Sequence, residues 1–306
     1  IYCPAFPENG RTIFFGHLFV GNVLLSDSHM RHHPLTPMTD ASLVRVLARQ
    51  TPHKVGLVAL KQVQSGSATL RAALDGLAAD SVRHVVVDAV ADTDLGIIGE
   101  AVGDDLLVTG GSGVALGLPA AYRRRGLLAH KANADTLPRI SGAAAVLAGS
   151  CSAATLGQIA AFTGPHLHLD TDAICRGEPV GEKALAWARG KLGNGPILLS
   201  ASDKPDAVKA LQTKYGVETS SQAIEKTMAV LAKGLVAAGV GRLVVAGGET
   251  SGAVVGALDV TALRIGPEID PGVPWTASVG AKPLLLALKS GNFGAVDFFA
   301  KAFKVA

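Results

Sequence analysis

The chain has 306 residues, of which 48% are hydrophobic, 5% aromatic and 17% charged, and 36 are glycines. This composition is typical of a compact α/β enzyme with small-residue packing, and it excludes a disordered or fibrous chain. The net charge of +3 is small for this length, so we expect no nucleic-acid partner and no membrane-surface partner.

The first 50 residues are the least periodic part of the chain. A Gly/Pro/Asn turn over residues 7–11 precedes the segment TIFFGHLFVGNVLL, and a His- and Pro-rich stretch, SDSHMRHHPLTPMTD, follows. Long irregular loops of this kind are often functional. Thr39 and Asp40 then form the expected cap of a helix over Leu43–Ala48.

From residue 55 onward, expected strands and helices alternate. Strands are predicted at 55–60, 83–90 and 106–109, and an amphipathic helix is predicted at 67–79. A break between Gly126 and Gly142 places the expected domain boundary near residue 140.

The second half of the chain starts a new alternation. The expected strands lie at 143–148, 166–170, 196–200, 242–246, 263–266 and 284–289, and the expected helices at 152–162, 182–192, roughly 221–238 and from Thr250 onward. Short runs rich in Val and Leu, separated by helices, predict mainly parallel sheets flanked by helices. We therefore expect an α/β fold with two domains, over residues 1–140 and 141–306.

Four of the expected strands end in glycine-rich turns, namely Gly110–Gly113, Gly149–Ser152, Gly247–Gly252 and Ser290–Gly294. A turn between a buried strand and a helix exposes backbone N–H groups beside the positive end of the helix dipole, which suits phosphate or carboxylate groups. Four such turns in one chain indicate a phosphorylated or acidic ligand and favour a nucleotide. None of them matches GxxxxGK[ST] or GxGxxG, so the nucleotide site is expected to be of a non-Walker type.

The turns differ in their chemical content. Thr250 and Ser251 are expected to cap a helix and to donate hydroxyl groups to phosphate, although a plain tight turn has the same pattern. The Lys289–Gly294 segment would present a lysine and amides to phosphate, line a purine, or serve as an ordinary loop before a final helix. Gly149–Ser152 offers two hydroxyls and a thiol, but Cys151 has no basic neighbour in sequence that would make it a nucleophile.

Two other groups of polar residues have competing interpretations. Asn9, Gly10 and Arg11 either bind a carboxylate or phosphate, since Arg favours bidentate anion binding, or form a surface turn. The acids at the end of the second expected strand either face a cleft or are solvated, and these are Asp88, Asp92 and Asp94.

Three histidines in the irregular loop, His29, His32 and His33, invite a metal interpretation. Their sequence neighbours supply only Asp27 and Asp40, which do not complete a plausible ligand set. We therefore predict no metal site formed by protein residues alone.

Seven segments in combination resemble a known family over essentially the whole chain: CPAFPENGRTIFFGHLFVGN, MRHHPLTPMTD, LVTGGSG, AGSCS, VAGGETSG, IGPEIDPGVPW and ALKSGNFG. They look like the four-carbon acid sugar kinase family, and within it the 3-oxo-tetronate kinase branch. The resemblance implies an ATP-dependent kinase that phosphorylates the terminal hydroxyl of a four-carbon sugar acid, giving 3-oxo-tetronate 4-phosphate. It also implies an N-terminal acid-sugar domain, a C-terminal nucleotide domain, and Mg²⁺ bridging the β and γ phosphates.

The resemblance divides the candidate residues between two ligands. The residues expected on the substrate side are Asn9, Gly10, Arg11, Gly110, Gly111 and Ser112. The residues expected on the ATP side are Ser150, Cys151, Ser152, Gly247, Gly248, Glu249, Thr250, Gly252, Ser290, Gly291, Asn292 and Gly294. No catalytic base is assigned; by resemblance, an acidic residue of the family's DDxTGA loop, which this chain does not contain, is the suspected one.

The chain opens on Ile1 at what looks like the end of a strand, so we expect that an N-terminal segment is absent and that the substrate domain is only partly present. Two alternative functions follow: a nucleotide- or acid-binding module without turnover, and a dinucleotide-dependent oxidoreductase, which would need a GxGxxG turn. Three cysteines without paired spacing, no signal peptide and no apolar run of membrane-spanning length predict a cytoplasmic protein. Ala-rich helices and sheet edges would allow a homodimer.

Overall fold

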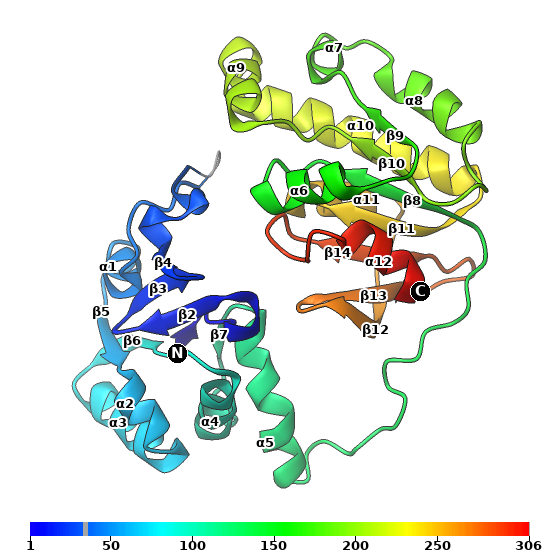
Figure 1. The fold of residues 1–306 in the computed structure, drawn as a ribbon. Coiled ribbons are helices and arrows are strands. Elements are labelled where there is room, and N and C mark those ends of the chain that lie inside the picture. The colour runs from blue at the N-terminus through cyan, green and yellow to red at the C-terminus, as the bar shows by residue number, and fades with distance from the viewer. Residues whose placement is uncertain (33–35, 306) are drawn as a thin grey trace. The chain divides into compact units, whose positions relative to one another are not determined.

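The computed structural model describes residues 1–32 and 36–305, and its internal contacts divide the chain into two units (Figure 1). Unit 1 comprises Ile1–Ala132 and unit 2 comprises Asn133–Ala306. Both units contain parallel strands and flanking helices, so the expected α/β fold is confirmed. No helix within the described ranges is long and apolar enough to cross a membrane.

Unit 1 contains a four-stranded parallel sheet with the order β5-β6-β1-β7. Its strands are β1 (Tyr2–Cys3), β5 (Lys54–Val58), β6 (Val82–Val87) and β7 (Thr109–Gly110). Its flanking helices are α2 (Leu60–Gln64), α3 (Ser67–Ala79), α4 (Asp92–Val102) and α5 (Leu118–Arg124). The bounds of α3 are those that its amphipathic pattern predicts, because Leu70 and Leu74 lie one turn apart and are both buried.

A three-stranded antiparallel sheet in unit 1 was not expected from the sequence. It consists of β2 (Arg11–Phe14), β3 (His17–Val20) and β4 (Val23–Leu24), and α1 (Leu43–Ala48) follows it. Gly10, Gly16 and Gly21 have positive φ angles and form the tight turns around these strands. The signal was therefore present as three closely spaced glycines rather than as a long periodic run.

Several local expectations in unit 1 were wrong in detail. Leu106 and Leu107 are exposed and lie outside the sheet, and the strand there is the short Thr109–Gly110. Ser42, rather than Thr39 or Asp40, caps α1 by accepting a hydrogen bond from the Arg45 N–H. The apolar run 55–60 covers β5 and the start of the short helix α2, because an apolar run alone does not mark where a strand ends.

Unit 2 contains a seven-stranded sheet with the order β12-β13-β14-β11-β8-β10-β9 (Figure 1). The strands are β8 (Ala143–Ala148), β9 (His166–His168), β10 (Ile197–Ser200), β11 (Val240–Ala246), β12 (Leu263–Asp270), β13 (Val273–Ser278) and β14 (Leu285–Lys289). The run from β14 to β9 is parallel, whereas β12 and β13 form an antiparallel hairpin at one edge. The segment that we expected to be a single short strand at 263–266 is the start of this hairpin.

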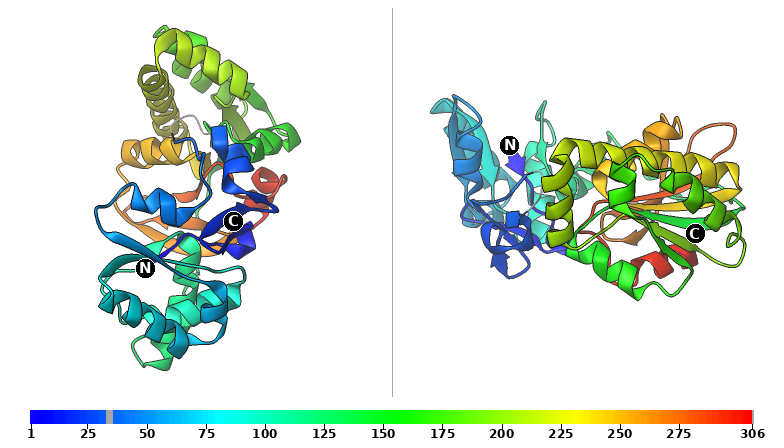
Figure 2. Two further views of the ribbon diagram at one scale, coloured as in Figure 1. Left: turned by 90° about the vertical axis from the view of Figure 1, so that its left-hand side faces the viewer. Right: turned by 90° about the horizontal axis from the view of Figure 1, so that it is seen from above.

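Helices cover both faces of the sheet in unit 2 (Figure 2). One face packs against α6 (Ala153–Ala161) and α12 (Phe298–Val305), and the other packs against α7 (Thr171–Cys175), α8 (Val180–Arg189), α10 (Val217–Ala237) and α11 (Gly248–Ala257). A further helix, α9 (Pro205–Tyr215), precedes α10. Alternate residues of each central strand enter the two cores, as Leu243 and Val244 show, which is why these strands read as continuous apolar runs.

Candidate functional site

Three of the glycine-rich turns lie at the carboxyl ends of three neighbouring strands in unit 2. The parallel register pairs Ala246 of β11 with Ala148 of β8 on one side and with Lys289 of β14 on the other, so all three strands end at the same level. The turns are hydrogen-bonded to one another: the N–H groups of Gly149 and Ser150 donate to the Ala246 carbonyl (2.9 and 3.1 Å). The Gly247 N–H donates to the Lys289 carbonyl (2.8 Å).

The glycines in these turns allow a close approach that a side chain would prevent. A Cβ atom on Gly149 would lie closer than 3.0 Å to Thr250 Oγ1, and one on Gly291 would lie closer than 3.0 Å to Ser150 Oγ. Gly247 has a φ of +131°, and its Cβ would lie 2.9 Å from Thr250 Oγ1. The three turns therefore form one compact cluster of backbone amides and hydroxyl groups.

The helix that follows β11 begins without a side-chain cap. Helix α11 starts at Gly248, with Gly247 as the N-cap residue, so its first N–H groups have no side-chain acceptor. Gly248 and Glu249 are exposed at this end. This arrangement concentrates the positive end of the helix dipole at the turn, where an anion is stabilised.

The expectation that Thr250 and Ser251 cap this helix was wrong. The helix begins two residues earlier, and Thr250 is buried in its first turn with its hydroxyl against Gly149. The Ser251 hydroxyl is buried and has no hydrogen-bond partner in the described part of the chain. Neither hydroxyl group caps the helix, and that of Thr250 packs between two of the turns.

The helix that follows β8 is capped and linked to the third turn. The Ser152 hydroxyl accepts a hydrogen bond from the Thr155 N–H (3.2 Å) and donates to the Gly291 carbonyl (2.6 Å). The Gln158 side-chain amide donates to the carbonyls of Phe293, Gly294 and Ala295 at 2.9–3.0 Å. Helix α6 therefore fixes the course of the Ser290–Gly294 loop, which contains Asn292 and the left-handed Gly294.

Lys289 does not present its side chain to solvent, contrary to one of our expectations. It is 1% exposed, and its ammonium group donates to Thr155 Oγ1 (2.9 Å) and to the carbonyls of Gly291 (2.9 Å) and Ser290 (3.3 Å). Burial lowers the pKa of Lys289 to about 8. The charge lies beneath the loop cluster rather than on its surface.

Cys151 has the surroundings of a structural thiol. Its sulfur accepts a hydrogen bond from the Asp203 N–H (3.4 Å), and burial raises the pKa of the thiol above its ordinary value. Reactive cysteines have a lowered pKa, so the geometry argues against a nucleophilic role. Asp203 itself was missed by sequence reasoning, although it lies three residues after the end of β10, at the same end of the sheet as the glycine turns. Its carboxylate lies 3.7 Å from His168 at the end of β9.

The two substrate-side turns of unit 1 also follow neighbouring strands. Tyr2 pairs with Thr109 and Cys3 with Gly110, so the segments after β1 and β7 leave the sheet side by side. A Cβ atom on Gly113 would lie closer than 3.0 Å to Ala5 O, which shows how closely the two segments approach. The turn residues Asn9, Gly10, Gly111 and Ser112 are all half-buried or exposed.

Arg11, at the start of β2, is a half-buried cation that pairs with no carboxylate in the described part of the chain. Its guanidinium forms no ion pair with any residue that the structure describes, and its hydrogen bonds, to the Asn9 carbonyl (3.4 Å) and Met30 Sδ (3.8 Å), are long. Burial lowers the pKa of Arg11 below its ordinary value. A cation held in this way is suited to an incoming anion.

Asp88 and Asp94, expected at the edge of a cleft or in solvent, are both buried and bonded to backbone. The Asp88 carboxylate accepts hydrogen bonds from the N–H groups of Phe15 (2.7 Å), Gly16 (2.8 Å) and Leu60 (3.1 Å), and burial raises its pKa. Asp94 accepts from the N–H groups of Val90 and Ala91. Both carboxylates therefore hold loops in place.

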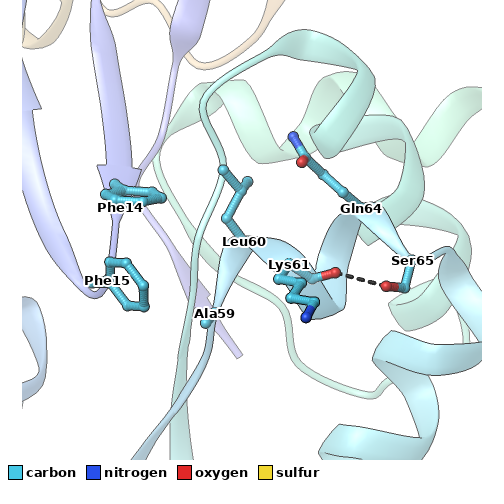
Figure 3. Close-up of a pocket in the computed structure, with 7 residues that line it drawn as sticks. All are labelled: Phe14, Phe15, Ala59, Leu60, Lys61, Gln64 and Ser65. Carbon is cyan, nitrogen blue, oxygen red and sulfur yellow. Dashed lines mark hydrogen bonds between the residues drawn. The ribbon is translucent and has the colours of Figure 1, made fainter.

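The loops anchored by Asp88 border a pocket of about 460 Å³ within unit 1 (Figure 3). Phe14 and Phe15 form one wall, and the residues of the opposite wall are Ala59, Leu60, Lys61, Gln64 and Ser65. Phe15 is 61% exposed and has a φ of +47°, which is strained for an aromatic residue. No residue that we proposed for substrate binding lines this pocket, and its exposed aromatic pair gave no signal in the sequence.

The histidine-rich segment shows no metal cluster among the residues that can be described. His29 and His32 belong to a short 3₁₀ helix, whereas His33 lies outside the described residues. No group of three His, Cys, Asp or Glu residues that could hold a metal ion occurs within residues 1–32 and 36–305.

Comparisons with known proteins match both units. Residues 1–118 match a family described as a sugar-binding N-terminal domain, and residues 145–299 match one described as a nucleotide-binding C-terminal domain. The chain is 57% identical to a 3-oxo-tetronate kinase of Burkholderia multivorans, covering 99% of this chain and 71% of that protein. It is 54% identical to a 3-oxo-tetronate kinase of Cupriavidus necator, with the same coverage of 99% and 71%.

Solved structures agree with these matches. A structure from Salmonella typhimurium LT2 is 40% identical with a TM-score of 0.78, covering 98% of this chain and 72% of that one. A structure from Haemophilus influenzae is 42% identical with a TM-score of 0.67, covering 99% of this chain and 73% of that one.

Proposed function

The chain belongs to the four-carbon acid sugar kinase family, and on that premise we propose that it catalyses the ATP-dependent phosphorylation of the 4-hydroxyl group of 3-oxo-tetronate. The structural observation that carries this proposal is the cluster of three glycine-rich turns at the ends of β8, β11 and β14. It is an anion site built from backbone amides, without the Walker pattern.

The nucleotide phosphates bind at this cluster. The uncapped start of α11 at Gly248 supplies backbone N–H groups and the positive end of a helix dipole. The absence of side chains at Gly149 and Gly291 keeps the turns close enough for one polyphosphate to contact more than one of them. The residues that we assign to ATP are therefore those of the three turns that the sequence predicts.

Mg²⁺ fits this site as a companion of the nucleotide. Mg²⁺ is usually held by one or two carboxylates together with substrate phosphates, and the same edge of the sheet carries Glu249 at the start of α11 and Asp203 after β10. We assign these two carboxylates to the ion. When bound, Mg²⁺ neutralises charge on the phosphate oxygens during transfer.

The sugar acid binds in unit 1, with Arg11 holding its carboxylate. The guanidinium is half-buried and has no ion pair among the described residues, so it gains a partner when an acid binds. Asn9 and the Gly110–Ser112 turn lie on the two adjacent chain segments that leave β1 and β7, where they would bind hydroxyl groups of the same acid.

Phosphoryl transfer requires positioning and charge neutralisation more than covalent chemistry by the protein. The 4-hydroxyl oxygen of the acid forms a bond to the γ-phosphorus, and the bond from that phosphorus to the bridging oxygen breaks. ADP leaves, and the proton of the hydroxyl group is released to solvent. The turns of unit 2 hold the phosphates for this step, and Arg11 orients the acceptor.

All three cysteines are free, which supports a reducing, cytoplasmic setting.

The test is an assay of this chain with ATP, Mg²⁺ and 3-oxo-tetronate. Formation of ADP and of a sugar-acid 4-phosphate in equal amounts, detected by phosphorus NMR, is the expected result. Nucleotide binding without product would instead support the alternative of a binding module without turnover, and absence of both would refute the proposal.

Arginine variants test the acid side of the site. Loss of one charge-assisted hydrogen bond costs about 1.5–3 kcal/mol, so Arg11→Ala should raise the KM for the acid by about ten- to 150-fold and leave the KM for ATP unchanged. Arg31→Ala is the matched control, since Arg31 is exposed and its guanidinium donates to the Ser26 carbonyl (3.0 Å). Equal KM values for the acid in both variants would show that Arg11 does not bind the acid.

A further inference from the structure

A buried cation lies beneath the nucleotide turns. Lys289, the last residue of β14, is 1% exposed and forms no ion pair with any described residue. Burying a charge without a counter-charge is costly, and an apolar side chain of the same length would fill the space more favourably. The retained positive charge therefore calls for an explanation beyond packing.

The hydrogen bonds of Lys289 converge on one carbonyl group. Its ammonium donates to the Gly291 carbonyl (2.9 Å), which also accepts hydrogen bonds from the hydroxyls of Ser152 (2.6 Å) and Thr155 (3.0 Å). Lys289 donates to Thr155 Oγ1 as well (2.9 Å). Three donors on a single carbonyl oxygen fix the direction of the Gly291–Asn292 peptide, whose N–H points to the opposite side because the peptide is trans.

We propose that Lys289 is a positioning residue for the nucleotide: it orients the Gly291–Asn292 peptide of the Ser290–Gly294 loop, and its buried charge stabilises the bound polyphosphate. This inference rests on the proposed function, since it assigns the nucleotide to the same three turns. Lys289 acts by orienting the loop and by the electrostatic attraction between its charge and the phosphates, without touching the reacting atoms. A Coulomb interaction in a site of low dielectric constant is much stronger than the same interaction in water.

Few ionisable side chains lie on the elements around Lys289 in the described part of the chain. Helix α6 and the Ser290–Gly294 loop carry no ionisable side chain. On the neighbouring turns lie Cys151 and Glu249, and on the side of α12 Asp270 is paired with Lys301. Burial raises the pKa of Cys151, which favours the neutral thiol. Burial is the only cause that lowers the pKa of Lys289, to about 8.

This environment predicts a pH dependence of nucleotide affinity with a definite sign. A bound polyphosphate favours the protonated amine, so affinity must fall as the free protein loses that proton above its pKa. With a pKa of about 8 in the free protein, the Kd for ADP with Mg²⁺ should rise about tenfold between about pH 7 and pH 9. Phosphate groups are already ionised in this range and contribute no change of their own.

The experiment is calorimetric titration of the full chain with ADP and Mg²⁺ at these two pH values. Lys289→Met keeps the length of the side chain but removes its charge, so it should weaken binding at pH 7 and abolish the pH dependence. Thr155→Val keeps the charge and removes one hydroxyl, so it should weaken binding but retain the pH dependence. In turnover, Lys289→Met should raise the KM for ATP and leave the KM for the sugar acid unchanged.

The possible outcomes separate a failure of this inference from a failure of the proposed function. A flat pH profile in the wild type, or the wild-type slope in Lys289→Met, overturns the role of Lys289 while the kinase assignment stands. No ADP binding by folded wild type overturns the nucleotide half of the proposed function and this inference with it. If Lys289→Met does not fold, the slopes of the wild type and of Thr155→Val decide the question.

Discussion

Two glycines on helix α11 provide a direct test of where the nucleotide binds. Gly248 lies at the first position of the helix and Gly256 in its last turn, and a Cβ atom on either would meet no protein atom within 4 Å. The protein therefore tolerates alanine at both positions. A difference in ADP binding between the two alanine variants would therefore come from a ligand at the start of the helix.

The expected magnitudes follow from helix propensity and from the geometry of the turn. Alanine in place of glycine in a helix interior stabilises by about 0.5–1 kcal/mol, so Gly256→Ala should raise the free energy of unfolding by that amount and leave ADP binding unchanged. Gly248→Ala should place a methyl group where a phosphate approaches the backbone. Losing one charge-assisted hydrogen bond there costs about 1.5–3 kcal/mol, or about ten- to 150-fold in Kd.

A third variant, Gly248→Asp, adds a negative charge at the same place. It should weaken binding further than Gly248→Ala, because two like charges about 4 Å apart repel by about 4 kcal/mol at the effective dielectric constant of a protein surface. The assay is calorimetric titration with ADP and Mg²⁺, with urea unfolding to show that each variant is folded. Wild-type affinity in Gly248→Asp would refute the assignment of phosphate to this turn.

Three further predictions concern stability, each measured by urea unfolding. Asp88→Asn leaves at least one of the three backbone N–H donors without an acceptor and should cost about 1–3 kcal/mol; no change would show that the buried carboxylate is dispensable. Gly117→Ala places a Cβ against the carbonyl of Leu95, a residue of helix α4, and should destabilise unit 1 by about 1–3 kcal/mol. Gly96→Ala, next to Leu95 on α4, has open space and should stabilise the unit, so equal effects would contradict the packing argument. The pKa of Lys289 is about 8 in the folded protein and its ordinary value is 10.5, so the unfolded chain binds more protons between these pH values. From about pH 7.5 to pH 9.5, the free energy of unfolding of the wild type should therefore rise by about 2 kcal/mol relative to that of Lys289→Met. Curves of unfolding free energy against pH that run parallel for the two proteins would refute this.

Local patterns in the sequence were sufficient for many of the elements. Helix α3 and strand β8 have the bounds predicted from their residues, because a helical stripe of buried leucines and a short continuous apolar run are properties of neighbouring residues. The three glycine-rich turns of unit 2 were also predicted, since each comes at the end of an apolar strand. The β2–β4 sheet, the β12–β13 hairpin and the start of α11 were not predicted, because short strands and helix ends depend on pairing and packing partners.

The sequence by itself determined the α/β class, the chemical character of the turns and the family that they resemble. Only the tertiary structure decided that β14, β11 and β8 are neighbours, and this order is what brings together the turns at residues 149–152, 247–252 and 290–294, which are separated in the sequence. Only the tertiary structure buried Lys289 beneath those turns and Thr250 between them. The physical reason is that strand order and burial arise from long-range hydrogen bonding and packing, whereas propensity and turn chemistry are carried by each short segment alone.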